Sequence, residues 1–121
     1  MSLSTYSIGK SGESIASTHL INLGFKILER NWQFSHAEID IIADNQEFII
    51  FVEVKYRKSN TFGAPESFVS RKKQALIIRA ANAYIRQKNV QTEARFDIIA
   101  ITGMEPNQQI DHIPFAFYPT L

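Results

Sequence analysis

Apolar and polar residues alternate with two different periods along the chain, and the period identifies each predicted element. From about residue 11 to 23 the period is helical, and Gly24 follows as a stop signal. The inner stripe of this helix is expected to consist of Ile15, Ala16, His19, Leu20 and Leu23. A second helix is expected from about residue 68 to 88, where apolar residues again recur at helical spacing: Leu76, Ile77, Ala80, Ala81 and Tyr84.

Strand-like alternation marks the rest of the ordered chain. Strands are expected in "FKILERNWQF" (25–34), "AEIDIIAD" (37–44), "FIIFVEVKYRK" (48–58), "EARFDIIAIT" (93–102) and, as an edge strand containing a proline, "HIPFAFY" (112–118). Loops are expected at 57–67 and 103–109. Short links make the first three strands a meander, and the long helix before the fourth strand favours a parallel crossover. The sequence therefore predicts an α/β fold of order αβββαβ(β), a mixed sheet flanked by helices.

Length and composition limit the class of protein. With 121 residues, of which 45% are apolar, the chain suits one globular domain over residues 1–121, with a core at about 9–102 and an edge strand or tail at 103–121. No stretch has the length of a membrane span, and the first residues lack the apolar run of a signal peptide. Because there is no cysteine, disulfides and thiolate metal sites are excluded, and a cytoplasmic location is expected.

Charge is unevenly distributed, although the net charge is only +1. Residues 53–88 carry nine Lys or Arg against two acids, giving +7, and the remainder carries four bases against ten acids, giving −6. This division suits a polyanion that meets the basic part, although ordinary solvated side chains would give the same count.

Four ionisable residues occupy positions where a core would prefer apolar ones. Alternation places Ile39, Ile41 and Ala43 on one face of their strand, with Glu38, Asp40 and Ile42 on the other. Glu53 and Lys55 share one face of the next strand, and Glu13 borders the buried stripe of the first helix. Buried carboxylates are costly unless they are paired or bind a cation. Asp40 and Glu53 on adjacent strands therefore suggest a Mg²⁺ site, with Lys55 near the reacting phosphate.

Each residue also has an ordinary interpretation. Glu53 and Lys55 could be a solvent-facing pair, Asp40 a strand-end aspartate, and Glu13 an acid favoured by the helix dipole. The combination of a helix acid, then Asp40, then Glu53-Val54-Lys55 after twelve intervening residues is more specific than any of its parts.

This combination resembles the PD-(D/E)XK signature of the restriction-endonuclease-like superfamily. More narrowly, "GKSGESIASTHLINLGFKILERNW", "AEIDIIA", "FIIFVEVKYRKSNTFGAPES", "KKQALIIRAANAYI" and "RFDIIAI" resemble the YraN-like family of uncharacterised bacterial predicted endonucleases, which are similar to archaeal Holliday-junction resolvases. The resemblance covers residues 9–101 and implies the restriction-endonuclease-like fold. Ile39 replaces the proline that often precedes the first acid, and Ala37 stands where the family often has glycine.

The resemblance implies roles for individual residues. Asp40 and Glu53 match the metal-binding acids, Lys55 the catalytic lysine, and Glu13 an additional acid that binds the metal directly or through water. The Val54 backbone carbonyl would be a further ligand. Glu38 and Gln74 are accessory candidates, the latter as a polar residue early on the second helix.

Basic residues supply the expected interface with nucleic acid. Lys72, Arg79 and Arg86 are seven residues apart and line one side of the second helix. The expected contact residues are Arg57, Lys58, Arg71, Lys72, Lys73 and Arg79. Together these features predict a Mg²⁺- or Mn²⁺-dependent endonuclease for branched or junction DNA. A ribonuclease with the same site and a non-catalytic nucleic-acid-binding or scaffolding module remain open, and the apolar tail "IPFAFYPTL" leaves a homodimer open.

Overall fold

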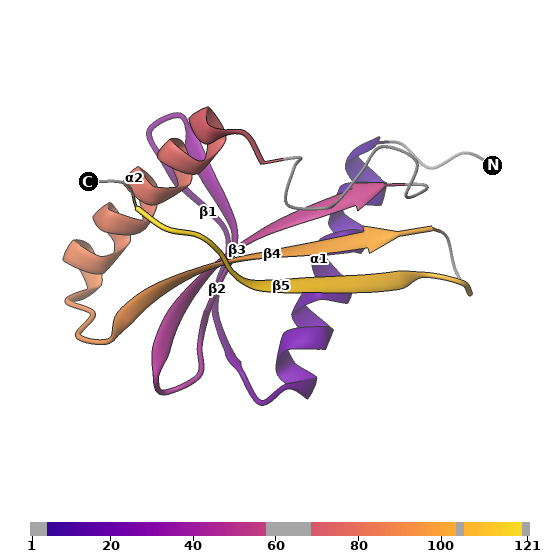
Figure 1. Ribbon diagram of the computed structural model, residues 1–121, viewed down its shortest axis with the longest axis horizontal. Coiled ribbons are helices and arrows are strands. Elements are labelled where there is room, and N and C mark those ends of the chain that lie inside the picture. Colours follow the sequence, from indigo (N-terminus) through magenta and orange to yellow (C-terminus); the bar gives the residue numbers. More distant parts are fainter. Residues whose placement is uncertain (1–4, 58–68, 104–105, 120–121) are drawn as a thin grey trace.

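The described residues form two helices and five strands (Figure 1). The computed structural model describes residues 5–57, 69–103 and 106–119. Its elements in chain order are α1 (Thr5–Asn22), β1 (Lys26–Phe34), β2 (Ala37–Asp44), β3 (Phe48–Arg57), α2 (Arg71–Lys88), β4 (Glu93–Thr102) and β5 (Gln109–Phe117). This order confirms the predicted αβββαβ(β) arrangement, with the last strand present.

The five strands form one mixed sheet of order β1-β2-β3-β4-β5. β1, β2 and β3 pair antiparallel as a meander, and β5 pairs antiparallel with β4. β3 and β4 pair parallel over their whole length, from Phe48↔Glu93 to Arg57↔Thr102, because α2 carries the chain across the sheet between them. The predicted parallel crossover is therefore confirmed.

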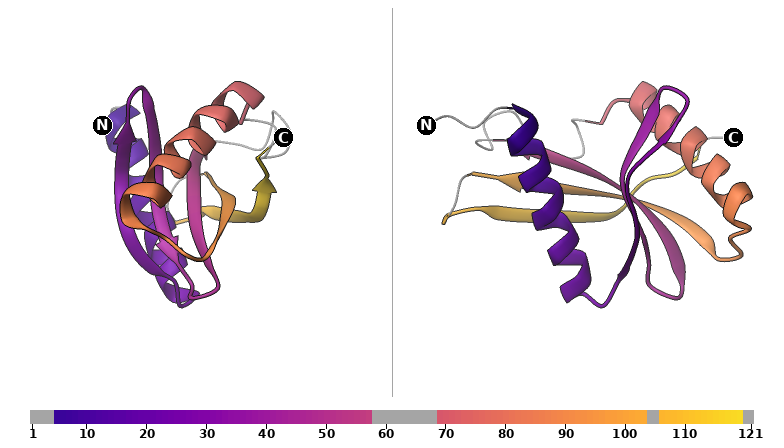
Figure 2. Two further views of the ribbon diagram at one scale, coloured as in Figure 1. Left: turned by 90° about the vertical axis from the view of Figure 1, so that its left-hand side faces the viewer. Right: turned by 180° about the vertical axis from the view of Figure 1, so that it is seen from behind.

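The helices cover opposite faces of the sheet and lie toward opposite ends of its twisted strands (Figure 2). Alternate residues of β3 divide between the two cores: Ile49 and Phe51 pack with α2, whereas Ile50 and Val52 pack with α1. α2 contributes its buried residues Ile77, Ala80, Ala81 and Tyr84 to its side, and α1 contributes Ala16 and Leu20 to the other. β3 is thus the central strand, buried on both faces.

Several predicted boundaries need correction. α1 begins at Thr5 rather than Ser11, in a segment whose glycines lower its intrinsic helix propensity. Leu23 lies beyond the last turn and is 53% exposed, so it does not belong to the inner stripe. α2 begins at Arg71 rather than near residue 68, because the Ser70 hydroxyl caps it. β5 begins at Gln109 rather than His112. The predicted loop at 57–67 lies, beyond Arg57, outside the described residues.

Candidate metal centre

Asp40 lies at a point on β2 where the regular alternation of side chains between the two faces of the sheet is interrupted. Ile39 packs in the core beneath α2, whereas Ile41 and Ala43 pack beneath α1. The prediction that these three share one face is therefore wrong. The reversal occurs at Asp40 and has a counterpart on β1, where Asn31 adopts a positive φ of 54° between the facing pairs Arg30↔Ile41 and Trp32↔Ile39. A residue in the left-handed conformation re-aims the side chains on either side of it.

Asp40 also marks the point where β2 and β3 separate. Their paired positions end at Ile41↔Val52. Beyond that pair, the Asp40 carboxylate oxygen Oδ2 accepts a hydrogen bond of 2.7 Å from the Val54 amide. This contact brings Asp40 beside Glu53, and the two carboxyl groups hydrogen bond to each other. Glu53 is only 6% exposed, so the predicted pair of acids meets in a place poor in water.

Burial makes ionisation of Asp40 costly. Desolvation, followed by the charge of Glu53 and the hydrogen bond to it, raises the pKa of Asp40 to about 8. The Val54 amide and the Lys73 ammonium oppose this rise. Near neutral pH and without a cation, Asp40 therefore holds a proton beside Glu53.

Two further acids lie close to Asp40. One carboxylate oxygen each from Glu13, Glu38 and Asp40 lies within 4.8 Å of the others. Burial, followed by the charge of Asp40, raises the pKa of Glu13, and a hydrogen bond with the Asn31 side chain opposes the rise. The structure thus places Glu38, predicted as an accessory residue, alongside Glu13 and Asp40 in a cluster of carboxylate oxygens.

Two lysines border the acids. Lys55 is half-buried and follows Glu53 by two residues on β3, on the same side of the strand. Lys73, predicted as a nucleic-acid contact, extends from α2 toward β3, and its Nζ atom lies 3.8 Å from Glu53 Oε2. The Gln74 side chain donates to the Val69 carbonyl at 3.0 Å, which anchors it to the backbone before α2. The Val54 carbonyl remains a predicted ligand.

Most of the remaining residues that were predicted to contact nucleic acid lie on α2. Arg71, Lys72 and Arg79 are exposed, as is Arg86 on the same helix. Arg57 is half-buried at the end of β3, where its carbonyl accepts a hydrogen bond of 2.9 Å from the Gly103 amide. Lys58 lies outside the described residues.

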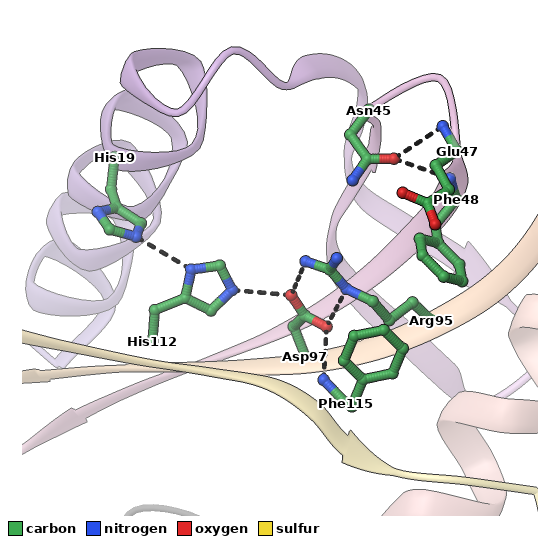
Figure 3. A network of polar contacts seen from close by, with 8 residues as sticks. All are labelled: His19, Asn45, Glu47, Phe48, Arg95, Asp97, His112 and Phe115. Carbon is green, nitrogen blue, oxygen red and sulfur yellow. Dashed lines mark hydrogen bonds and ion pairs between the residues drawn. The ribbon is translucent and has the colours of Figure 1, made fainter.

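A second polar network, not predicted from the sequence, lies on the α1 side of the sheet (Figure 3). Asp97 is fully buried and accepts two hydrogen bonds from Arg95, at 2.9 and 2.8 Å. His112 Nε2 lies 2.7 Å from the Asp97 carboxylate, and its Nδ1 lies 3.0 Å from His19 Nε2 on α1. The Phe115 amide completes the set at 3.2 Å. The network therefore joins α1, β4 and β5.

The electrostatics of this network favour a charged aspartate. Burial alone would raise the pKa of Asp97, but hydrogen bonds from His112 and Arg95 outweigh it, and the pKa lies below its ordinary value. Burial, and then the charge of His112, lowers the pKa of His19. The Arg95 guanidinium also lies 5.0 Å from the centre of the Phe115 ring. The signal in the sequence is the Arg95-Phe96-Asp97 segment, which places two charges beside the apolar run 98–101 of β4.

Comparison with known proteins places the chain in a family. The Uncharacterised protein family UPF0102 matches residues 12–101. The chain belongs to UPF0102. Relatives in this family include a UPF0102 protein of Flavobacterium johnsoniae, 45% identical with 92% of this chain and 94% of the relative covered, and one of Geobacter metallireducens, 45% identical with 97% of each covered. The UPF0102 match and the YraN-like resemblance point to the same group, whose name carries no activity.

Neither described helix of this UPF0102 protein is long and apolar enough to cross a membrane. The cluster of Glu13, Glu38 and Asp40 lies within the matched residues 12–101, and so does the Asp40–Glu53 pair.

Proposed function

We propose that this UPF0102 protein is a Mg²⁺- or Mn²⁺-dependent nuclease that hydrolyses phosphodiester bonds in DNA and prefers branched or junction structures. The observation that carries the proposal is the Asp40–Glu53 pair, in which Glu53 is buried and Asp40 is half-buried. Two carboxyl groups in contact, one of them 6% exposed, are unfavourable as a purely structural feature, and a divalent cation relieves their repulsion.

The residues present fit a hard divalent cation. Asp40 and Glu53 would hold it, and Glu13 and Glu38 are near enough to Asp40 to bind directly or through water. All of these ligands are oxygens, as Mg²⁺ and Mn²⁺ prefer. When bound, the ion supplies a Lewis acid for a phosphate oxygen and lowers the pKa of a coordinated water.

The chain's own cations account for the other requirements of phosphodiester hydrolysis. Lys55 lies two residues beyond Glu53 on the same side of β3, where its ammonium would stabilise charge that develops on the phosphate or orient the attacking water. The exposed basic residues of α2 extend away from the acids and would hold the phosphates of the nucleic acid: Arg71, Lys72, Arg79 and Arg86. No base-reading element is proposed, so selectivity would depend on the shape of the substrate.

A homodimer and a DNA rather than RNA substrate are parts of the same proposal. Exposed apolar side chains on and after β5 offer a surface for a second copy: Ile110, Phe115 and Tyr118, which are 38%, 41% and 64% exposed. The alternative is a binding module without catalysis. It would bind nucleic acid through the same basic helix, and the acids would have no catalytic role.

The proposal is tested by incubating the protein with labelled single strands, duplexes, flaps and four-way junctions of DNA, and with matching RNA, in Mg²⁺, Mn²⁺ or EDTA. Metal-dependent cleavage should be lost in Asp40→Asn and Lys55→Ala. It should be retained in Glu93→Gln, which removes an exposed acid from β4. Binding without cleavage of any substrate would instead support the binding module, and cleavage of RNA alone would identify a ribonuclease.

A further inference from the structure

Lys73 occupies an unusual position for a lysine. It is the third residue of α2, where the helix dipole disfavours a positive charge. Its amide is held at 3.1 Å by the Ser70 hydroxyl that caps the helix, so the first turn is fixed in place. From this turn the side chain reaches Glu53 on β3. The Lys73 ammonium is therefore paired with a buried acid at a helix end that disfavours its charge.

The contact between Lys73 and Glu53 is suited to being broken. The Nζ–Oε2 distance of 3.8 Å exceeds that of a direct hydrogen bond, so the attraction is mainly electrostatic. The Lys73 side chain is 40% exposed, whereas that of Glu53 is 6% exposed. The ammonium can therefore withdraw into solvent while the acid stays buried.

We infer that Lys73 substitutes for the metal ion in the metal-free protein, leaves Glu53 when a divalent cation binds, and then contacts a phosphate of the nucleic acid. This inference rests on the proposed metal centre. A dication at Glu53 would replace the charge that Lys73 supplies and would repel its ammonium at the same time. The released side chain would lie on α2 next to Lys72, among the exposed basic residues of that helix. Metal binding and nucleic-acid binding would thus be coupled through one side chain.

The inference predicts that removing Lys73 strengthens metal binding. To displace Lys73, Mg²⁺ must break the attraction between two unit charges about 4 Å apart, which is equivalent to roughly fivefold in affinity even at the dielectric constant of water. We expect Lys73→Gln to bind Mg²⁺ at pH 8 about fivefold more tightly than the wild type in isothermal titration calorimetry, and Lys72→Gln to change the affinity by less than about twofold. Lys72 is the matched control because it is the neighbouring lysine and is exposed. A Lys73 with a merely structural role would leave the Mg²⁺ affinity unchanged or weaken it.

The second part of the inference is tested with labelled junction DNA, with binding measured in EDTA and in Ca²⁺ and cleavage monitored throughout. The loss of affinity caused by Lys73→Gln should be larger in Ca²⁺ than in EDTA, because only the metal frees the ammonium. Lys72→Gln should cause the same loss in both buffers. An equal effect of Lys73→Gln in both buffers would overturn this part.

The outcomes separate the inference from the proposed metal centre. If wild type and Lys73→Gln bind Mg²⁺ with equal affinity, the exchange is wrong and the metal centre stands. If neither binds Mg²⁺ although both unfold cooperatively on heating, the metal centre and the exchange are both wrong. The exchange is supported if Lys73→Gln binds Mg²⁺ more tightly than the wild type does. It is also supported if Lys73→Gln binds Mg²⁺ and the wild type does not.

Discussion

The Asp40 carboxylate accepts a hydrogen bond of 2.7 Å from the Val54 amide, which joins β2 to β3 beyond the last paired residues of the two strands. The backbone pairing of the two strands ends at Ile41↔Val52, so this side-chain contact replaces it at Asp40. The hydrogen bond keeps Asp40 beside Glu53, the residue before Val54. This contact thus holds Asp40 in place and also opposes the rise in its pKa.

The raised pKa of Asp40 predicts that metal-free protein loses stability as the pH rises. Asp40 ionises near 3.8 in the unfolded chain and near 8 in the folded one. Between these values the folded protein holds a proton that the unfolded chain has released, so the free energy of unfolding falls from about pH 4 to 8. The fall is at most about 1.4 kcal/mol per pH unit. Urea denaturation in EDTA at pH 5, 6.5 and 8 measures it.

Asp40→Asn provides the comparison, since it cannot ionise. Its stability should fall less with pH than that of the wild type, and it should be the more stable protein at pH 8 in EDTA. Parallel pH profiles for the two proteins would show that Asp40 ionises normally.

The buried network on the α1 side should contribute strongly to stability. Replacing Asp97, which is 0% exposed, with Asn leaves Arg95 without its charged partner. Breaking one side of a buried ion pair costs about 3–5 kcal/mol, and we expect Asp97→Asn to lose that much in urea denaturation at pH 7. Glu93→Gln, on an exposed position of the same strand, should change stability by about 0.5 kcal/mol or less. A loss below about 1 kcal/mol for Asp97→Asn would contradict this description.

The basic side of α2 should determine how salt affects nucleic-acid binding. If about four of its charges contact phosphates, log K plotted against log salt should have a slope near −3.6 for duplex DNA. Lys72→Gln and Arg79→Gln should each make the slope less negative by about 0.9. Asn82→Ala, an uncharged change at an exposed position of α2, should leave it unchanged. Equal slopes for all four proteins would place the interface elsewhere.

The sequence predicted the sheet because its strands obey simple rules. β2 and β4 have the predicted bounds, and the helical segment between β3 and β4 makes their pairing parallel. The Asp40–Glu53 contact also follows from residue spacing, since adjacent antiparallel strands bring such positions together. These features depend on local periodicity and chain connectivity, which the sequence displays directly.

Other features depend on local exceptions to periodicity. The reversal at Asp40 is matched by the positive φ of Asn31 on the neighbouring strand, and alternation alone cannot reveal it. On β5, Phe115 has a φ of 53°, and the register with β4 shifts between Phe96 and Ile98, opposite Asp97. This irregularity aims the Phe115 amide at Asp97. Such irregularities can be recognised only when the pairing of both strands is known.

The central claim is that Asp40 and Glu53 hold a divalent cation, and anomalous scattering from a crystal grown with Mn²⁺ at pH 8 tests it most directly. The account predicts a peak about 2.1–2.2 Å from a carboxylate oxygen of each residue, with the Lys73 ammonium withdrawn from Glu53. The same crystal form of Asp40→Asn should lack the peak. A wild-type crystal with no peak between Asp40 and Glu53, or with Mn²⁺ bound only at other residues, would contradict the claim.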